Sequence, residues 1–571
     1  MSGRIEKRGT GMSQGSELAR TPCPIVSGRV RMGWLLAILA LAVISSMLCT
    51  GYRDIKGANH PLQLIIVQKI HNPDLYTTDA FVESTVFAYA SLLWYGVAYM
   101  SYYLDIHFLL FSLFVLNRVL YAVAFYIIGC LFFPNSRIAP VGALTFFAFS
   151  PASIIGSGHP IRDYAEQTGL AVACALLLLI AFVQRRYMLV AMLLGAVINL
   201  NLMYGIFAIC YLFTSLVFVD AHRRDWGRIL ASVVVGVVIG LPALALVLFS
   251  ASQPVTNETA VWQTAELLFP SHFFPNAESV KDHAVFLSVV FISIVVCRRK
   301  CSTEMNPLPW KNLMVWSWLA LVFYFLYWAV PYLLQSLAML HVQPIRGHDS
   351  WFLIGGAVLC GSLLTSLQRA FWGEREKFAI GGLVALSLIN GVISHTERVR
   401  ETGNWLGIPY TVSDKIAVWA KQNTPQETVF LIPVAHVDDW SHFRHLSQRG
   451  IFAHWKDGSA WPYAPWFAEE WLNRLYLLGL AEVAGIDPKT YRVGKWVHLG
   501  RGFVQLYREV DQHLTQAHVE HVARRYRIDY WVLPEHKRTT FPVVYRTDGW
   551  KVVRVIPKGG IATERPTATP P

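Results

Sequence analysis

The chain has 571 residues, of which 54% are hydrophobic and only 15% are charged, and its formal net charge is +12. In soluble domains about a quarter of the residues are charged, so the composition excludes an ordinary soluble protein and indicates an integral membrane protein. The basic residues are spread over loops, as is typical of the cytoplasmic side of a membrane, and they do not indicate nucleic-acid binding.

The amino-terminal residues 1–32 are basic and rich in Gly and Ser, and we expect a disordered cytoplasmic tail there. The apolar run 33–50 follows. It has no clear small-x-small cleavage site, so we interpret it as an uncleaved first span. All eight cysteines precede residue 361 and most lie in apolar runs, which argues against a disulfide framework.

Apolar runs of about span length predict 10–12 membrane spans over residues 33–394, separated by outer loops at 51–83 and 156–168. The run 188–219 is too long for one span and is interrupted at Asn199-Leu-Asn201, so it predicts either two short helices or one long tilted helix. If both outer loops lie on the same side, one segment between them does not cross. The Tyr- and Ser-rich stretch 84–104 is the best candidate for an interfacial helix. The runs lie at 33–50, 84–104, 107–132, 138–157, 169–183, 188–219, 229–251, 283–297, 313–335, 351–368 and 378–394.

The composition changes after Ser394, where charges, proline and tryptophan become more frequent. A capped helical pattern over 413–422 precedes a short strand pattern at 429–433. Further strand patterns follow near the end of the chain, at 528–533, 543–545 and 550–556. We therefore expect an extracytoplasmic α/β domain over 395–556, followed by a disordered tail at 557–571.

The first outer loop is the most acidic part of the membrane half, with Asp54, Asp74, Asp79 and Glu83. Carboxylates at the mouth of a helix bundle are costly and suggest function. Asp79 and Asp54 are candidates for a catalytic base or for an anchor of a donor phosphate. The alternatives stay open: Asp74 and Asp79 suit helix caps, and Asp54 suits a surface ion pair.

The second outer loop carries His159, Arg162, Asp163 and Glu166 within eight residues. If this stretch is helical, the four side chains share one face. Asp163 and Glu166 are therefore candidate catalytic acids, and His159 and Arg162 candidate substrate ligands. A solvated helix end explains the same pattern.

Two later loops each hold one candidate substrate ligand. His272 lies between prolines and aromatic residues, in a segment that suits either ligand binding or a rigid interfacial loop. Arg346 lies just before the next apolar run, where it suits bidentate phosphate binding or contact with lipid headgroups.

The last domain combines arginines with many aromatic residues. Arg444 and Arg449 are candidates for binding sugar hydroxyls, beside tryptophans that can stack on sugar faces. A small aromatic core closed by ion pairs is the alternative.

The order of these segments resembles the GT-C class of polytopic glycosyltransferases, and most closely an uncharacterised bacterial branch of it. The resemblance covers most of residues 33–556. It rests on Pro73-Asp-Leu-Tyr-Thr-Thr-Asp79 in the first loop, Arg162-Asp-Tyr-Ala-Glu166 in the second, His272-Phe-Phe-Pro275, and Phe443-Arg444 in the last domain. The first loop departs from better-known members because it lacks a tight Asp-Glu or Asp-x-Asp pair.

The resemblance implies a transferase in the bacterial inner membrane. It would move a sugar from a lipid-linked polyprenyl-phosphate donor to a glycan, lipid or protein outside the cytoplasm. The catalytic role would fall to Asp54 or Asp79, and a secondary acidic role to Asp163 or Glu166. No cofactor is certain and a divalent metal is left open. A non-catalytic component of surface polysaccharide assembly or export, or a transporter, is the alternative function.

Overall fold

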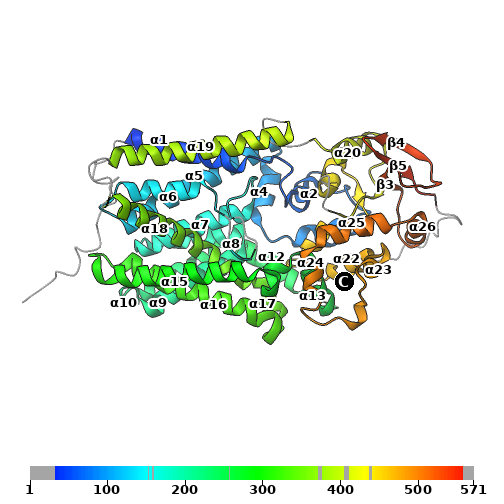
Figure 1. Ribbon diagram of the computed structural model, residues 1–571. Helices are drawn as coiled ribbons and strands as arrows, with labels where there is room; N and C mark the ends of the chain where they lie inside the picture. The colour runs from blue at the N-terminus through cyan, green and yellow to red at the C-terminus, as the bar shows by residue number, and fades with distance from the viewer. Residues whose placement is uncertain are drawn as a thin grey trace, which may run out of the picture.

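The structure is a computed structural model that describes residues 32–151, 154–156, 160–255, 257–368, 370, 376–403, 410–435 and 440–556. A long helical bundle carries a mixed α/β domain at one end (Figure 1). The predicted disordered tails lie outside the described residues, except for Met32, which begins the first helix.

Six helical segments are long and apolar enough to cross a membrane, so the chain is a helical, multi-pass membrane protein. The pair α11 (Trp226–Ile239) and α12 (Leu241–Ala251) makes a seventh if its 63° bend lies within one span. The six are α1 (Met32–Thr50), α5 (Ile106–Phe132), α15 (Val280–Thr303), α16 (Leu308–Ala329) with η3 (Val330–Leu334), α17 (Leu337–Val342) through α18 (Asp349–Leu367), and α19 (Glu376–Thr402).

Four shorter apolar helices lie among these segments, and the expected 10–12 spans are reached only if they cross as well. One of the four, the largely buried α7, packs against α5, α8 and α9. The run 188–219 forms two helices, because the chain becomes extended at Asn201 between α8 and α9. The four are α6 (Ile138–Ala148), α7 (Gln167–Val183), α8 (Tyr187–Leu200) and α9 (Leu202–Phe218).

The stretch 84–104 contains no helix of span length. Its longest helix, α4 (Leu92–Met100), has nine residues and packs against α2 (His60–His71) of the first loop. A nine-residue helix rises only about 14 Å, roughly half of a bilayer core. The two acidic loops consequently lie at the same end of the bundle, as the hydrogen bond from Asn59 to Glu166 shows directly.

The carboxy-terminal domain lies at that same end, which we name the junction end. Its five-stranded sheet has the order β2-β1-β3-β5-β4, with β1 parallel to β2 and β3, and β5 antiparallel to β3 and β4. The predicted helix and strands are all present, whereas the two-residue strand β2 was not predicted. The elements are α20 (Val412–Asn423), β1 (Val429–Leu431), β2 (Gly450–Ile451), β3 (Tyr530–Pro534), β4 (Val543–Thr547) and β5 (Trp550–Arg554).

A helical insert between β2 and β3 was not predicted either. It packs against α13, which belongs to a loop of the membrane half. One continuous hydrophobic core joins this insert, the first loop and α13, so the junction end is a single packed unit. Helix α13 spans Glu258–Leu268, and α21 (Phe443–Ser447) lies between β1 and β2. The elements of the insert include η8 (Trp455–Ala460), α22 (Phe467–Leu477), α23 (Leu480–Ala484), α24 (Val497–Arg501), α25 (Phe503–His513) and α26 (Gln516–Arg525).

Candidate functional site

Asp79 caps a helix at the junction end. Its carboxylate accepts a hydrogen bond from the Val82 amide at 3.2 Å and begins the short helix α3 (Ala80–Thr85). The preceding turn places Tyr76 in the left-handed region at φ +66°, where the Tyr76 carbonyl accepts from the Asp79 amide. Asp79 is therefore the N-terminal cap of α3, which was one of the two interpretations of this residue from the sequence.

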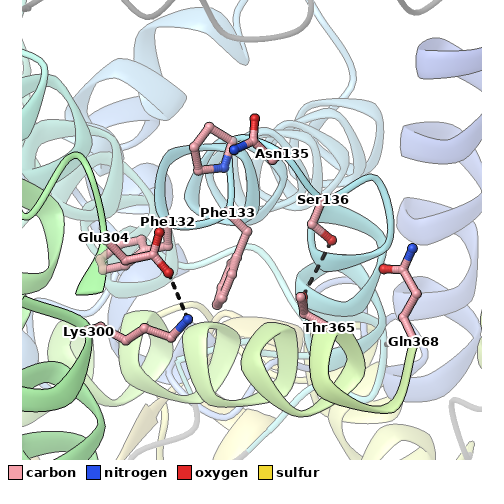
Figure 2. Close-up of a pocket in the computed structure, with 9 residues that line it drawn as sticks. Phe132, Phe133, Asn135, Ser136, Lys300, Glu304, Thr365 and Gln368 are labelled. Carbon is pink, nitrogen blue, oxygen red and sulfur yellow. Dashed lines mark hydrogen bonds and ion pairs between the residues drawn. The ribbon is translucent and has the colours of Figure 1, made fainter. Parts of the chain in front are cut away.

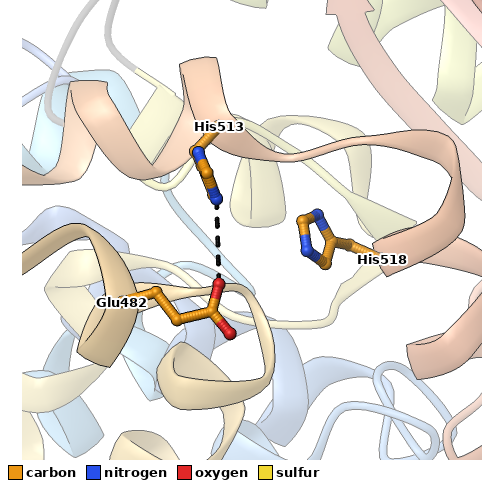
Figure 3. Close-up of side chains that lie close together, drawn as sticks. All are labelled: Glu482, His513 and His518. Carbon is orange, nitrogen blue, oxygen red and sulfur yellow. Dashed lines mark ion pairs between the residues drawn. The ribbon is translucent and has the colours of Figure 1, made fainter.

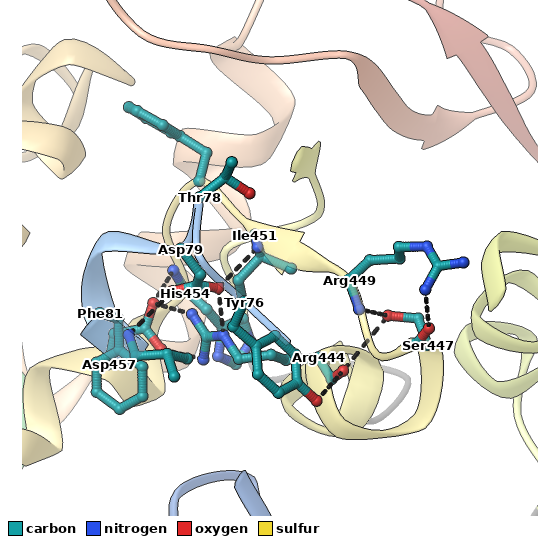
Figure 4. A network of polar contacts seen from close by, with 12 residues as sticks. Tyr76, Thr78, Asp79, Phe81, Arg444, Ser447, Arg449, Ile451, His454 and Asp457 are labelled. Atoms are coloured by element: carbon teal, nitrogen blue, oxygen red, sulfur yellow. Dashed lines mark hydrogen bonds and ion pairs between the residues drawn. The ribbon is translucent and has the colours of Figure 1, made fainter. Parts of the chain in front are cut away.

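Arg444 binds Asp79 and Asp457 at once in a buried triad (Figure 4). Its Nε donates to Asp79 Oδ2 at 2.7 Å, and its two terminal nitrogens donate to Asp457 at 2.8 and 3.0 Å. Asp79 Oδ2 also accepts from the Ile451 amide at 2.9 Å. Burial disfavours the charged guanidinium, yet the two carboxylates raise the pKa of Arg444 above its usual value. Asp79 and Arg444 thus join the first loop to the α/β domain.

Asp54 and Asp163 form partly exposed ion pairs. Asp54 contacts His107 and accepts a hydrogen bond from the Tyr52 hydroxyl at 3.2 Å. Asp163 lies 2.9 Å from Arg53 Nε, and about half of the Arg53 side chain is exposed. Neither carboxylate lies in the buried triad of Asp79.

Glu166 is the buried acid of the second loop. Its Oε1 accepts from the Asn59 amide at 2.6 Å, and its Oε2 lies 3.4 Å from Arg162 Nε. The predicted shared helical face is wrong, because α7 begins only at Gln167 and the preceding residues are not helical. Glu166 and Arg162 meet through loop geometry instead. His159 lies outside the described residues.

Lys456 of the carboxy-terminal domain binds Asn59, the residue that also binds Glu166. Its ammonium donates to Asn59 Oδ1 at 2.9 Å and lies over the rings of Phe269 and Trp455. Burial lowers the pKa of Lys456 to about 8, with a smaller lowering by Arg162 and an opposing effect of Glu166. Asn59 therefore bridges a carboxylate and an ammonium from opposite halves of the chain.

His272 and Arg346 lie near Arg162 and Lys456. Burial lowers the pKa of His272 well below its usual value, and the charges of Arg346, Arg162 and Lys456 lower it further, so all three cations lie near enough to act on the imidazole. The Arg346 side chain has no hydrogen bond or ion pair to any described residue. We name this group the junction cluster; it comprises Asn59, Arg162, Glu166, His272, Arg346 and Lys456.

Close backbone packing brings the loops of the junction cluster together. Gly156 adopts φ +78°, and a β-carbon there would lie 2.9 Å from Ile345, next to Arg346. A β-carbon at Gly57 would lie 2.3 Å from the ring of Tyr164. Glycine at these two positions lets the first loop, the second loop and the segment before α18 approach one another.

Arg449 has a different place in the structure. Its guanidinium donates to the Lys421 and Thr424 carbonyls at 2.9 and 2.6 Å, at the carboxy-terminal end of α20. These carbonyls have no partners within the helix, so Arg449 is bound to the helix end. It is not part of the junction cluster.

A separate cavity of about 300 Å³ lies at the far end of the bundle, between the α5–α6 turn and the ends of α15 and α18 (Figure 2). None of the predicted site residues lines it. Its lining residues are Phe132, Phe133, Pro134, Asn135, Ser136, Lys300, Glu304, Thr365 and Gln368.

Comparison with known proteins places only one segment. Residues 413–478 match a family described as "Domain of unknown function (DUF6798)". No curated protein matches the chain. The matched segment runs from α20 to α22, and it contains Arg444 and Lys456, which bind Asp79 and Asn59 of the first loop.

Asn59 and Lys456 are the two cluster members that were not predicted as site residues. Asn59 lies among the acidic residues of the first loop, but an isolated amide carries no sequence signal. Lys456 follows a tryptophan in a region rich in charged and aromatic residues, where surface lysines are ordinary. Only the tertiary packing of the α/β domain against both loops identifies them.

Proposed function

We propose that this protein is a glycosyltransferase of a bacterial inner membrane. It takes a sugar from a polyprenyl-phosphate donor and passes it to a glycan, lipid or protein acceptor outside the cytoplasm. The observation that supports this most is the junction cluster at one end of an apolar bundle. There the buried Glu166 pairs with Arg162 at 3.4 Å and is linked to Lys456 through Asn59, and the charge of Arg346 acts on the neighbouring His272. A lipid-linked donor would place its chain among apolar helices and its phosphate at this boundary.

The cations of the cluster suit a phosphate. Arg346 has unused donors, and a guanidinium binds phosphate oxygens in a bidentate manner. Arg162 and Lys456 add charge in a largely buried setting, where water screens them less than at an exposed surface. Negative charge grows on the departing phosphate during sugar transfer, so fixed cations there stabilise the transition state.

Glu166 is the base in this proposal. An acceptor hydroxyl oxygen bonds to the sugar anomeric carbon as the bond from that carbon to the phosphate oxygen breaks. The electron pair stays on the phosphate, and the hydroxyl proton passes to Glu166. Its Oε2 makes an ion pair with Arg162 at 3.4 Å but no hydrogen bond, whereas its Oε1 accepts from Asn59. The catalytic role thus moves from Asp79 and Asp54 of the first loop to Glu166 of the second.

A second candidate is a non-catalytic component of surface polysaccharide assembly. It is favoured by one observation: Asp79, which the family resemblance marks as a base, is fully buried and bound to Arg444. Under this alternative the cluster binds an anionic lipid or glycan phosphate without chemistry. Glu166 would then be dispensable for the surface product, whereas the cations would not.

The test is complementation of a deletion strain, with surface glycans profiled and membrane levels checked. The variants are Glu166→Gln and Arg346→Gln, and the matched controls are Asp74→Asn and Arg492→Gln, both at exposed positions. Loss of one glycan in the deletion strain and in both cluster variants, with restoration by both controls, supports the transferase. Full restoration by Glu166→Gln alone favours the non-catalytic component, and an unchanged glycan profile on deletion refutes both.

A further inference from the structure

A group of metal-ligating side chains lies on the helical insert of the α/β domain, and none of its members belongs to the junction cluster (Figure 3). Glu482 comes from α23, His513 from the end of α25, and His518 from α26. One ligand atom from each lies within 4.8 Å of the others. Among the described residues, this is the only group of three or more His, Cys, Asp or Glu side chains that is arranged this closely.

We propose that Glu482, His513 and His518 bind a zinc ion. Two imidazoles and a carboxylate form a nitrogen- and oxygen-donor set that suits zinc and disfavours magnesium or calcium, which prefer oxygen alone. Tetrahedral zinc with bonds of about 2.0–2.2 Å needs its ligand atoms roughly 3.4 Å apart. Glu482 Oε2 and His513 Nε2 are already 3.7 Å apart.

The side chains have room to close on an ion. The Glu482 and His513 side chains are 70% and 54% exposed, so small rotamer changes can shorten the remaining distances. Neither of these two side chains makes a hydrogen bond to another described residue that would have to break. Three protein ligands leave a fourth position that water can fill.

The His518 ring is already oriented by Thr515. The Thr515 amide donates to His518 Nδ1 at 3.1 Å, in a capping box at the start of α26, so Nδ1 is the acceptor and the ring proton lies on Nε2. Zinc at Nε2 therefore requires the other tautomer. In that tautomer Nδ1–H donates to the Thr515 hydroxyl oxygen, which lies 3.0 Å away, and the bond from the Thr515 amide is lost. A hydrogen bond of this kind on the second ring nitrogen fixes the tautomer of a metal-bound histidine.

The ion would join three short helices whose apolar side chains already share one core. His513 and His518 flank the α25–α26 turn, and Glu482 approaches from the helix that packs against α25. The expected effect is local stabilisation of the insert, because a metal that binds only the folded state shifts the unfolding equilibrium. This inference is independent of the proposed glycosyltransferase activity.

The test uses the full-length protein in detergent, purified without a histidine tag and stripped with EDTA. Zinc chloride is titrated by calorimetry, and thermal unfolding is followed with and without zinc. The variants are His513→Asn, His518→Asn and Glu482→Gln. The matched control is His521→Asn, an exposed histidine on the same helix as His518.

We expect one zinc per chain, a higher unfolding temperature with zinc, and a loss of affinity of at least about tenfold in each variant, since even outer-ligand losses cost 10–100-fold. The control should bind like the unmodified protein, and magnesium should have no effect. Zinc that binds equally to all three variants would locate the site elsewhere, for example at the cysteines. Absence of saturable binding to the unmodified protein would equally overturn the proposal.

Discussion

Asp79 and Arg444, 365 residues apart in the chain, form a direct ion pair at 2.7 Å in which both side chains are almost completely buried. Arg444 also pairs with Asp457, so a single guanidinium binds two carboxylates inside the junction end. The pair fixes the first loop against the α/β domain. It also gives Asp79 a structural reason to be a carboxylate, which separates its role from that of Glu166.

Replacement of Asp79 by Asn should destabilise the protein. The change removes one of the two charges that Arg444 binds, although both hydrogen bonds to Asp457 remain, and a hydrogen bond to a charged group contributes about 1.5–3 kcal/mol. The unfolding temperature of the purified protein should therefore fall for Asp79→Asn and change little for Asp74→Asn, which is exposed. If Asp79→Asn were as stable as the unmodified protein but inactive, Asp79 would be a catalytic group after all.

Lys456 predicts an alkaline limit to ligand binding. Its pKa is lowered to about 8, mainly by burial, so the ammonium is charged at pH 7 and loses its proton as the pH rises through about 8. Transfer activity, or retention of an anionic lipid, should therefore fall between pH 7 and 9. In Lys456→Arg the guanidinium stays charged, and the fall should disappear if the variant still folds. An identical pH profile for both proteins would contradict a role for Lys456 in binding.

His445 predicts acid sensitivity of the junction end. Burial, with smaller effects of His60, Lys56 and Arg444, lowers its pKa to about 3 from the unfolded value of 6.5. The folded state therefore holds a neutral imidazole, and stability is complete above pH 6.5. As the pH falls from 6.5 towards 3, the unfolded state binds the proton first, which costs the folded state about 2 kcal/mol at pH 5.

The measurement for His445 is the unfolding temperature at pH 7.5 and pH 5. The decrease should be smaller in His445→Gln than in the unmodified protein, and unchanged in His536→Gln, whose side chain is exposed. Equal decreases in all three proteins would assign the acid sensitivity to other groups.

The membrane class and the strands of the last domain could be predicted from the sequence because their signals are local. Long apolar runs and short β-branched runs between turn residues decide these elements by composition alone. The insert between β2 and β3 could not be predicted in this way. Its helices are short and interrupted, and they are held by one core shared with α13 and the first loop. The last long helix also extends to Thr402, beyond the expected boundary at 394, because its polar final turns continue the helical hydrogen bonding.

The candidate site was predictable in part. Arg162, Glu166, His272 and Arg346 were predicted from residue type and predicted side. In the structure Arg162 pairs with Glu166, and the charges of Arg162 and Arg346 act on the neutral imidazole of His272. Asp79 and Arg444 were predicted for the same reasons but bind each other. Residue type cannot separate these outcomes, because a buried carboxylate needs a cation whether it is structural or catalytic. A structural ion pair and a binding site differ in whether the cation keeps N–H donors without a partner. That depends on contacts between segments that are distant in the sequence.

The arrangement of the two ends predicts a labelling pattern across the membrane. Asp74 of the first loop and Arg492 of the α/β domain are exposed at the junction end, whereas Arg299 is exposed near the opposite end of α15, a helix of 24 residues (Figure 1). Such a helix rises about 36 Å, enough to cross a bilayer. In a cysteine-free background, Asp74→Cys and Arg492→Cys should react with an impermeant maleimide from the same side, and Arg299→Cys only from the other side or after the membrane is opened. If positions 74 and 299 both reacted from the same side, the membrane orientation of the bundle would be contradicted. If positions 74 and 492 reacted from outside the cell, that result would also support an extracytoplasmic position of the proposed site.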